Sequence, residues 1–203
     1  MSETQDTYFT IAQPSEGLYK EKGSKFIAYA DKVYSEDEIK NILEKIRKDH
    51  PQSRHVCYAY RLGISGNNYR HNDDGEPSGT AGKPIYGQLL SFNVTNVLVA
   101  VVRYFGGTKL GVGGLITAYK EAAKDALENG GIVEETAKKT LIFSFDYGKM
   151  SDVMNFLKRN HLDFEQEFNE IPQIKVHIRL KDYKNIKNSL TKIESVKIKT
   201  EQP

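Results

Sequence analysis

The sequence contains one cysteine, Cys57, among its 203 residues. An internal disulfide needs two thiols and a cysteine-built zinc site needs several, so the chain forms neither by itself. Cys57 lies in the run His55–Leu62, where apolar and polar residues alternate. Such alternation is typical of a strand with one buried face. We therefore expect a buried strand cysteine rather than a nucleophile.

Long apolar runs and a strong charge of one sign are also absent. No stretch approaches the roughly 18 apolar residues of a membrane helix, and the first residues lack the basic segment and apolar run of a secretory signal. The expected location is therefore the cytoplasm. Lys and Arg number 29 and Asp and Glu number 27, which leaves a net charge of +2. This average does not indicate nucleic-acid binding, because phosphate binding needs a local surplus of Lys and Arg.

The length and the apolar pattern predict two α+β domains, over residues 1–135 and 136–203, with the boundary between Ile132 and Lys139. A capping box of Ser35 and Glu38 marks the first helix, which ends at Pro51. Strands of the first domain are expected over 8–11, 17–19, 24–33, 55–62 and 97–105, and later helices over 85–92 and 115–127. From residue 138 the pattern indicates β-α-β-β-α-β, the ferredoxin-like order.

The segment 106–114 carries five glycines in nine residues, between a buried strand and a helix. Glycine permits positive φ and close backbone approach, and a helix N-terminus directs free amides toward an anion. Lys109 adds a positive charge to this segment. The pattern favours an anion-binding loop over a tight packing turn. Neither a P-loop nor a dinucleotide fingerprint is present, because Pro84 follows Gly82-Lys83 and Ile116 stands where a third glycine is required.

A second polar loop, 71–83, allows two interpretations. Its carboxylates, Asp73, Asp74 and Glu76, together with a histidine, have the chemistry of a divalent-ion site, although the same residues suit a solvated turn. The following stretch of Ser, Gly and Thr is expected to cap the next helix and to offer a second set of amides to a phosphate. Arg54, His55 and Arg103 would share this rim if their two strands pair.

The first domain resembles the IMPACT/YigZ family through KGSKFIA at 22–28, HVCYAY at 55–60, NDDGEPSGTAGKP at 72–84 and VRYFGGTKLGVGGL at 102–115. The resemblance spans 15–133 and implies a first domain like domain IV of elongation factor G and a ribosomal-protein-like α/β sandwich. It also implies a second domain like domain V of that factor, which bacterial members add. Both likenesses imply a link to RNA or the translation machinery. The family has no securely assigned catalytic residues.

Two functions follow as hypotheses. The leading one is a non-catalytic protein with a translation-regulatory role that binds RNA or the ribosome, or another anionic ligand, through its glycine-rich loops without a cofactor. It requires Lys22, Lys25, Arg54, Lys83, Arg103 and Lys109 to gather on one face. The alternative is an enzyme acting on a small phosphorylated or peptide-like substrate with a divalent ion. The predicted ligand-binding residues are Arg54, His55, Ser78, Gly79, Thr80, Lys83, Arg103, Gly106, Gly107, Lys109, Gly111, Gly113 and Gly114.

Overall fold

The computed structural model describes residues 6–168 and 171–202. These residues form two compact units, one over 8–135 and the other from Thr136 onward together with Asp6 and Thr7. They are called the N-unit and the C-unit below. Residues 1–5, on which the expectation about a secretory signal partly rests, lie outside the described residues. No helix in the described ranges is long and apolar enough to span a membrane.

Asp6 and Thr7 were expected in the first domain, but they group with the C-unit. The reason is local hydrogen bonding. The carbonyl oxygen of Asp6 accepts a hydrogen bond from the backbone N–H of Ala137 at 2.6 Å. The carboxylate of Asp6 also forms an ion pair with Arg179, with Nε and Oδ2 3.1 Å apart.

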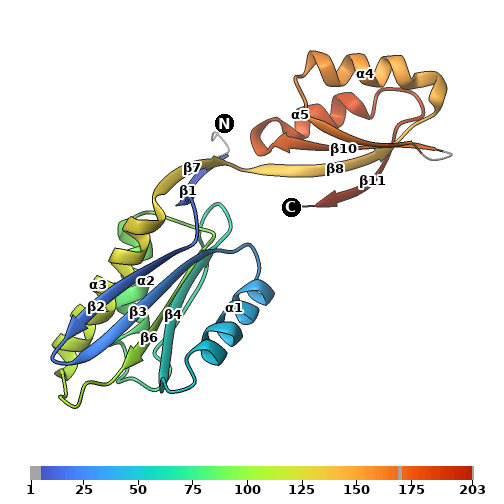
Figure 1. Cartoon of the computed structure of the whole chain (residues 1–203). Coiled ribbons are helices and arrows are strands. Elements are labelled where there is room, and N and C mark those ends of the chain that lie inside the picture. Colours follow the sequence, from blue (N-terminus) through green and yellow to red (C-terminus); the bar gives the residue numbers. More distant parts are fainter. Residues whose placement is uncertain (1–5, 169–170, 203) are drawn as a thin grey trace. The chain divides into compact units, whose positions relative to one another are not determined.

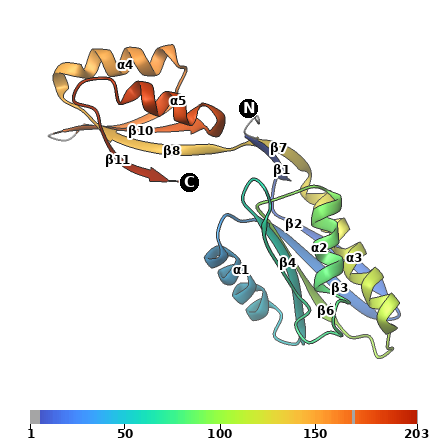
Figure 2. The same cartoon turned by 180° about the vertical axis from the view of Figure 1, so that it is seen from behind.

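The N-unit is built on a five-stranded sheet with the strand order β2-β3-β6-β4-β5. All neighbouring strands in it are antiparallel. Figures 1 and 2 show α2 and α3 on one face of this sheet and α1 on the other. The elements are β2 (Ser15–Glu21), β3 (Ser24–Lys32), α1 (Glu36–Asp49), β4 (His55–Leu62), β5 (Asn68–Asn72), α2 (Gly82–Ser91), β6 (Val97–Tyr104) and α3 (Gly111–Gly130).

β6 is the central strand, and every residue from Val97 to Arg103 is buried. It is paired on both sides and covered by helices on both faces, which explains its unbroken apolar sequence. Val99 and Val101 pack into the cluster formed with α2 and α3, whereas Leu98 and Val102 pack on the side of α1. The sequence prediction of a strand buried on both faces is confirmed.

The helices of the N-unit begin and pack for identifiable reasons. Ser35 Oγ accepts a hydrogen bond from the N–H of Glu38, so the predicted N-cap forms, whereas the Glu38 carboxylate accepts its bond from the N–H of Tyr34 at 2.8 Å, one residue before the N-cap. On the opposite face, α3 lies so close to β2 that a Cβ at Gly17 would collide with the backbone of Ala126. Only glycine permits this approach.

Two helices start earlier than the apolar pattern indicates. α2 begins at Gly82 rather than near residue 85, and α3 begins at Gly111 rather than Leu115. Glycine is a poor helix former, so sequence reasoning assigned these positions to loops. Their conformation is instead decided by the buried helical turns that follow, Ile85 in α2 and Leu115 in α3.

β1 (Thr7–Ile11) and β7 (Ile132–Thr136) pair as a separate two-stranded sheet. The C-unit has a four-stranded antiparallel sheet with the order β11-β8-β10-β9. Its elements follow the predicted β-α-β-β-α-β order, with a 3-10 turn before α4. They are β8 (Lys138–Ser144), α4 (Met150–Arg159), β9 (Phe164–Phe168), β10 (Pro172–Arg179), α5 (Leu180–Leu190) and β11 (Lys197–Gln202).

Candidate functional site

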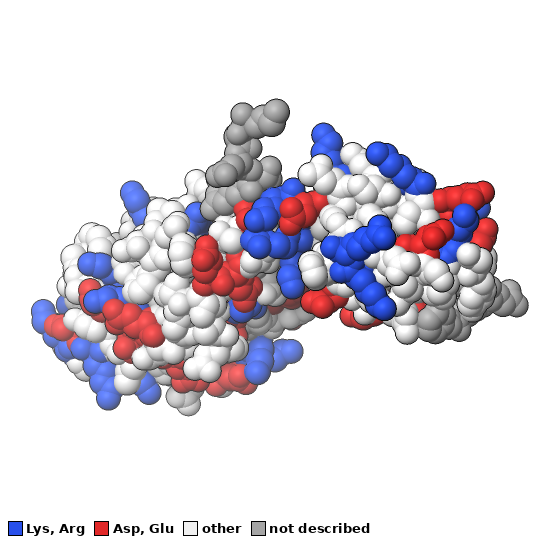
Figure 3. Space-filling model, turned by 90° about the horizontal axis from the view of Figure 1, so that it is seen from above, with Lys and Arg blue, Asp and Glu red and all other residues white. Residues whose placement is uncertain are grey.

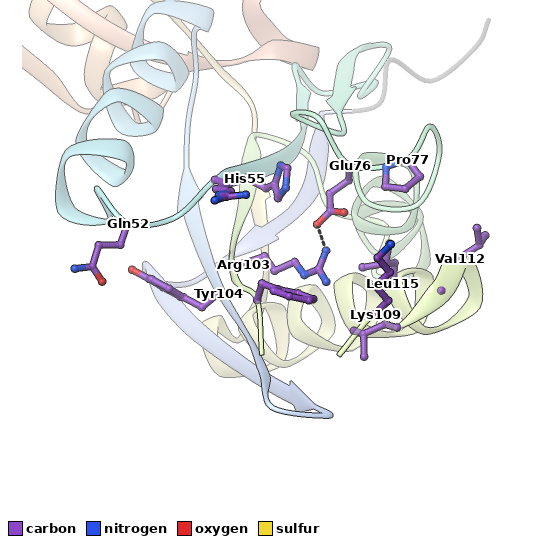
Figure 4. Close-up of a pocket in the computed structure, with 13 residues that line it drawn as sticks. Gln52, His55, Glu76, Pro77, Arg103, Tyr104, Lys109, Val112 and Leu115 are labelled. Atoms are coloured by element: carbon purple, nitrogen blue, oxygen red, sulfur yellow. Dashed lines mark hydrogen bonds and ion pairs between the residues drawn. The ribbon is translucent and has the colours of Figure 1, made fainter. Parts of the chain in front are cut away.

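A pocket of about 890 Å³ opens on the N-unit where β4 begins and β6 ends. Its walls also include Phe105, Lys109, Leu110, the first turn of α3 and the Glu76–Pro77 corner of the polar loop (Figure 4). His55 and Arg103 are paired residues in the β4–β6 register, which confirms that these two strand ends share one rim. The pocket volume is in the range of small-ligand sites, about 300 to 1,000 Å³.

The charged lining of the pocket is mainly cationic. Arg54, Arg103 and Lys109 line it, and Glu76 is the only carboxylate among its lining residues. Three positive charges less one negative charge leave a surplus of two. Arg54 and Lys109 are exposed, and neither forms an ion pair within the described part of the chain. The pocket is therefore a local surplus of positive charge in a nearly neutral protein.

The floor of the pocket is a buried ion pair between Arg103 and Glu76, with Nη1 and Oε1 2.6 Å apart (Figure 4). The side chains are only 9% and 3% exposed, respectively. The hydroxyl of Tyr119 donates to the same Oε1 at 2.9 Å, and the Cys57 thiol donates to that hydroxyl at 3.3 Å. This network fixes the guanidinium, because moving Glu76 would break its contacts with Arg103 on β6 and Tyr119 on α3.

Burial controls the protonation of the network. It raises the pKa of the Tyr119 hydroxyl far above its ordinary value, and the neighbouring Cys57 and Glu76 raise it further. Burial also raises the pKa of the Cys57 thiol, although its hydrogen bond with Tyr119 opposes this. Cys57 is fully buried, as the sequence predicts, and a thiol that stays protonated is a poor nucleophile. These groups therefore hold Arg103 in place and do not supply a reactive anion.

The guanidinium of Arg103 also contacts two aromatic rings. Its Cζ lies 5.5 Å from the ring centroid of Phe26 and 5.6 Å from that of Phe105. Both distances suit cation–π interaction. Its Nε is buried and has no hydrogen-bond partner among the described residues. Arg103 thus lines the pocket with hydrogen-bonding capacity that its own chain does not fill.

His55 and Asp74 form a separate contact at the rim. His55 Nδ1 lies 2.8 Å from the carbonyl oxygen of Asp74, so this nitrogen acts as the donor. The carboxylate of Asp74 accepts hydrogen bonds from the N–H of Val56 at 2.7 Å and from Arg47 at 3.1 Å. Burial alone would raise the pKa of Asp74, but Arg47 and the Val56 amide lower it below its usual value.

The polar loop binds an anion, but the anion is its own Asp73. This carboxylate accepts hydrogen bonds from the amides of Gly79, Ala81 and Gly82 at 2.8, 3.0 and 2.8 Å. These bonds outweigh the effect of burial and hold the pKa of Asp73 below its usual value. The expectation that this stretch offers amides to an external phosphate is therefore wrong. Asp73 caps α2 although it lies six to nine residues before the amides that it binds. The spacing rules for helix caps do not anticipate such a contact.

The three carboxylates proposed for a divalent ion do not converge. Asp73 faces the start of α2, Asp74 faces Arg47 and Glu76 faces Arg103. Within the described ranges, no group of three or more His, Cys, Asp or Glu side chains is arranged to hold a metal ion. The geometry gives this metal-site hypothesis no support, and we do not pursue it.

The glycine-rich segment divides into positions with different roles. A Cβ at Gly106 would collide with the backbone of Gly23, so this glycine serves close packing of two turns. Gly107 and Gly111 have φ values of 86° and 73°, which favour glycine. Gly113 has ordinary helical φ and open space around it. A side chain at Gly113 would therefore not strain the backbone, whereas one at Gly107 or Gly111 would.

Among the described residues, no side chain accepts a hydrogen bond from the first amides of α3. Its N-cap is Leu110, and the first turn has no acidic residue. Leu110, Gly111 and Val112 all line the pocket. The first amides of a helix have no partner within the helix and carry partial positive charge. The start of α3 thus lies at the pocket, four residues earlier than expected.

The pocket collects five of the thirteen predicted ligand-binding residues, namely Arg54, His55, Arg103, Lys109 and Gly111. The other predicted residues, Ser78, Gly79, Thr80, Lys83, Gly106, Gly107, Gly113 and Gly114, do not line it. Lys22 and Lys25 do not line it either. Sequence reasoning missed Phe105, whose position two residues after Arg103 on a strand could have indicated a shared face.

Comparison with known proteins identifies relatives along nearly the whole chain. The family model described as the Impact N-terminal domain matches residues 22–127. The IMPACT family member YvyE of Bacillus subtilis is 31% identical over 94% of this chain and 88% of its own length. An IMPACT family member of Thermus thermophilus is 37% identical over 71% of this chain and 78% of its own. A solved structure described as a hypothetical protein is 26% identical, with a TM-score of 0.73, over 96% of this chain and 97% of its own.

Proposed function

The chain belongs to the IMPACT family, and on this premise we propose that it binds RNA of the translation machinery, without catalysis, through the cationic pocket of the N-unit. The observation that carries the proposal is the difference between two helix starts. The amides at the start of α2 are filled by Asp73, whereas the first residues of α3 line a pocket with surplus positive charge. A phosphate group would therefore bind at the start of α3.

The residues around α3 match the needs of a phosphate ligand. Arg54 and Lys109 supply exposed charges, and Arg103 supplies a buried guanidinium whose Nε is unfilled. RNA-binding proteins place such cations and helix amides against the phosphate backbone, which positions the ligand without reading its sequence. The translation-regulatory role expected from the family resemblance fits this kind of contact.

The charge distribution predicts modest affinity. On the face shown in Figure 3, Lys and Arg are mixed with Asp and Glu rather than gathered in one patch. In this proposal, binding depends on the exposed cations of the pocket, Arg54 and Lys109. Two exposed cations correspond to a slope of about −1.4 to −1.8 in a plot of log affinity against log salt. A steeper slope would require cations outside the pocket.

The enzyme hypothesis gains no comparable observation. It needs carboxylates that converge on a divalent ion, and the three candidates face different partners. His55 Nδ1 donates its hydrogen to the backbone carbonyl of Asp74. The buried groups Tyr119 and Cys57 stay protonated. We therefore propose a binding role alone.

Titration of labelled ribosomal RNA fragments with the full chain tests the proposal. Lys109→Ala and Arg54→Ala should each weaken binding about 5- to 10-fold at low salt and reduce the salt slope by about 1. Lys40→Ala is the matched control, because Lys40 is an exposed lysine on α1 and does not line the pocket. The proposal is refuted if the unchanged protein does not bind RNA at about 50 mM salt, or if all three variants bind alike.

A further inference from the structure

The pocket carries an exposed aromatic ring that phosphate binding does not explain. Phe105 lines the pocket and is 59% exposed. It follows β6 directly, and Arg103 lies two residues before it on the same face of the strand. The guanidinium of Arg103 lies over the Phe105 ring at 5.6 Å. The guanidinium therefore covers one face of the Phe105 ring. The exposed area lies on the opposite face and the edge of the ring.

We propose that Phe105 stacks against an unpaired nucleobase, so that the ligand of the pocket is single-stranded RNA rather than a duplex. This inference rests on the proposed function, and it specifies which form of RNA the pocket takes. Proteins that bind single strands combine cations for the backbone with aromatic rings on which bases stack. Phe105 and Lys109 bring these two elements into one pocket.

The ring is held in position before any ligand arrives. Arg103 is anchored by its 2.6 Å contact with Glu76 and by the ring of the fully buried Phe26. Phe105 in turn lies against that anchored guanidinium. A cation on one face of a ring also reduces the negative potential of the opposite face, which favours stacking with the electron-rich face of a base.

A duplex cannot use this feature. In an RNA helix the bases are stacked on one another, and their faces are not available to a protein ring. Stacking on Phe105 therefore requires an unpaired base, in a loop, a bulge or a single-stranded end. The phosphates next to such a base would lie among the cations that line the same pocket, Arg54 and Lys109. Charge and stacking thus select the same ligand.

The test compares a single-stranded RNA of about 12 nucleotides with a blunt duplex of the same sequence, both titrated with the full chain. Phe105→Ala should weaken single-strand binding about 10-fold and leave duplex binding and the salt slope unchanged. Phe105→Tyr should restore single-strand binding because it keeps the ring. Tyr34→Ala is the matched control, since Tyr34 is 58% exposed and lies outside the pocket lining.

A fluorescent base analogue gives a direct reading of stacking. 2-Aminopurine within the single strand should be quenched on binding to the unchanged protein and to Phe105→Tyr, but much less by Phe105→Ala. If RNA binds, depends on Lys109 and is insensitive to Phe105→Ala, the stacking inference alone is overturned. If the protein binds neither the single strand nor the duplex, both the inference and the proposed function fail.

Discussion

Replacing Asp73 with alanine should destabilise the N-unit by about 3 kcal/mol. Its carboxylate accepts hydrogen bonds from three amides at the start of α2. Loss of a helix cap costs about 0.5 to 2 kcal/mol, and each buried amide left without a partner costs about 1 to 3 kcal/mol. Ala81 is fully buried and Gly82 is buried, whereas water can reach the half-buried Gly79. Two buried amides at the lower part of that range give the expected value.

Cys57 provides a reporter for this experiment. It is the only cysteine of the chain, it is fully buried in the N-unit, and the C-unit has none. Its rate of alkylation therefore measures how often the N-unit opens. A loss of about 3 kcal/mol should speed labelling about 100-fold, because each 1.4 kcal/mol corresponds to a factor of ten. The urea midpoint followed by circular dichroism should fall in parallel.

Two comparisons separate the cap from other roles of the loop. Ser78→Ala changes an exposed neighbour in the same loop and should stay within about 0.5 kcal/mol. Asp73→Ala should bind RNA as the unchanged protein does at temperatures where it is folded, because the amides of this loop do not line the pocket. If Asp73→Ala leaves Cys57 labelling within about threefold, or abolishes RNA binding while folded, the assignment is wrong.

Two further predictions concern the buried carboxylate of Glu76 and the two carboxylates with lowered pKa values, Asp73 and Asp74. Glu76→Ala leaves Arg103 as an uncompensated buried charge and should lower the free energy of unfolding in urea by about 3 to 5 kcal/mol. Glu128→Ala is the control, because Glu128 pairs with Lys124 at the surface, where the side chains are 53% and 44% exposed. This change should alter the free energy of unfolding by less than about 0.5 kcal/mol. Asp73 and Asp74 have folded-state pKa values below the ordinary value of 3.8. Their stabilisation is present above that value and is lost as the pH falls through the lower folded pKa, so the free energy of unfolding measured with urea should fall below about pH 4, and less so in Asp73→Asn.

Sequence reasoning recovered the features that depend on local pattern. The N-cap at Ser35 and the doubly buried strand β6 both follow from residue types at short spacing. It also predicted that His55 and Arg103 would share a rim if their strands pair, and the β4–β6 register pairs them. The pairing of strands therefore determines the part of the site that the sequence predicted, namely the rim with His55 and Arg103.

The features it missed depend on contacts between distant residues. Asp73 and Glu76 read alike as acidic loop residues, but one caps α2 and the other pairs with a residue 27 positions later. Nothing in the local pattern reveals which partner each carboxylate finds. The start of α3 was missed because three glycines in its first turns resemble a loop, although the packing of Leu115 and later residues decides the helix.

The position of Arg103 has a consequence for measurement. Arg103 ends the strand that runs through the centre of the core, so the pocket floor loses its shape only when the N-unit unfolds as a whole. A ligand that binds only the folded form raises the melting temperature by an amount set by its concentration and affinity. Thermal denaturation of the unlabelled protein can therefore rank RNA fragments, and Cys57 alkylation assigns any shift to the correct unit without further engineering.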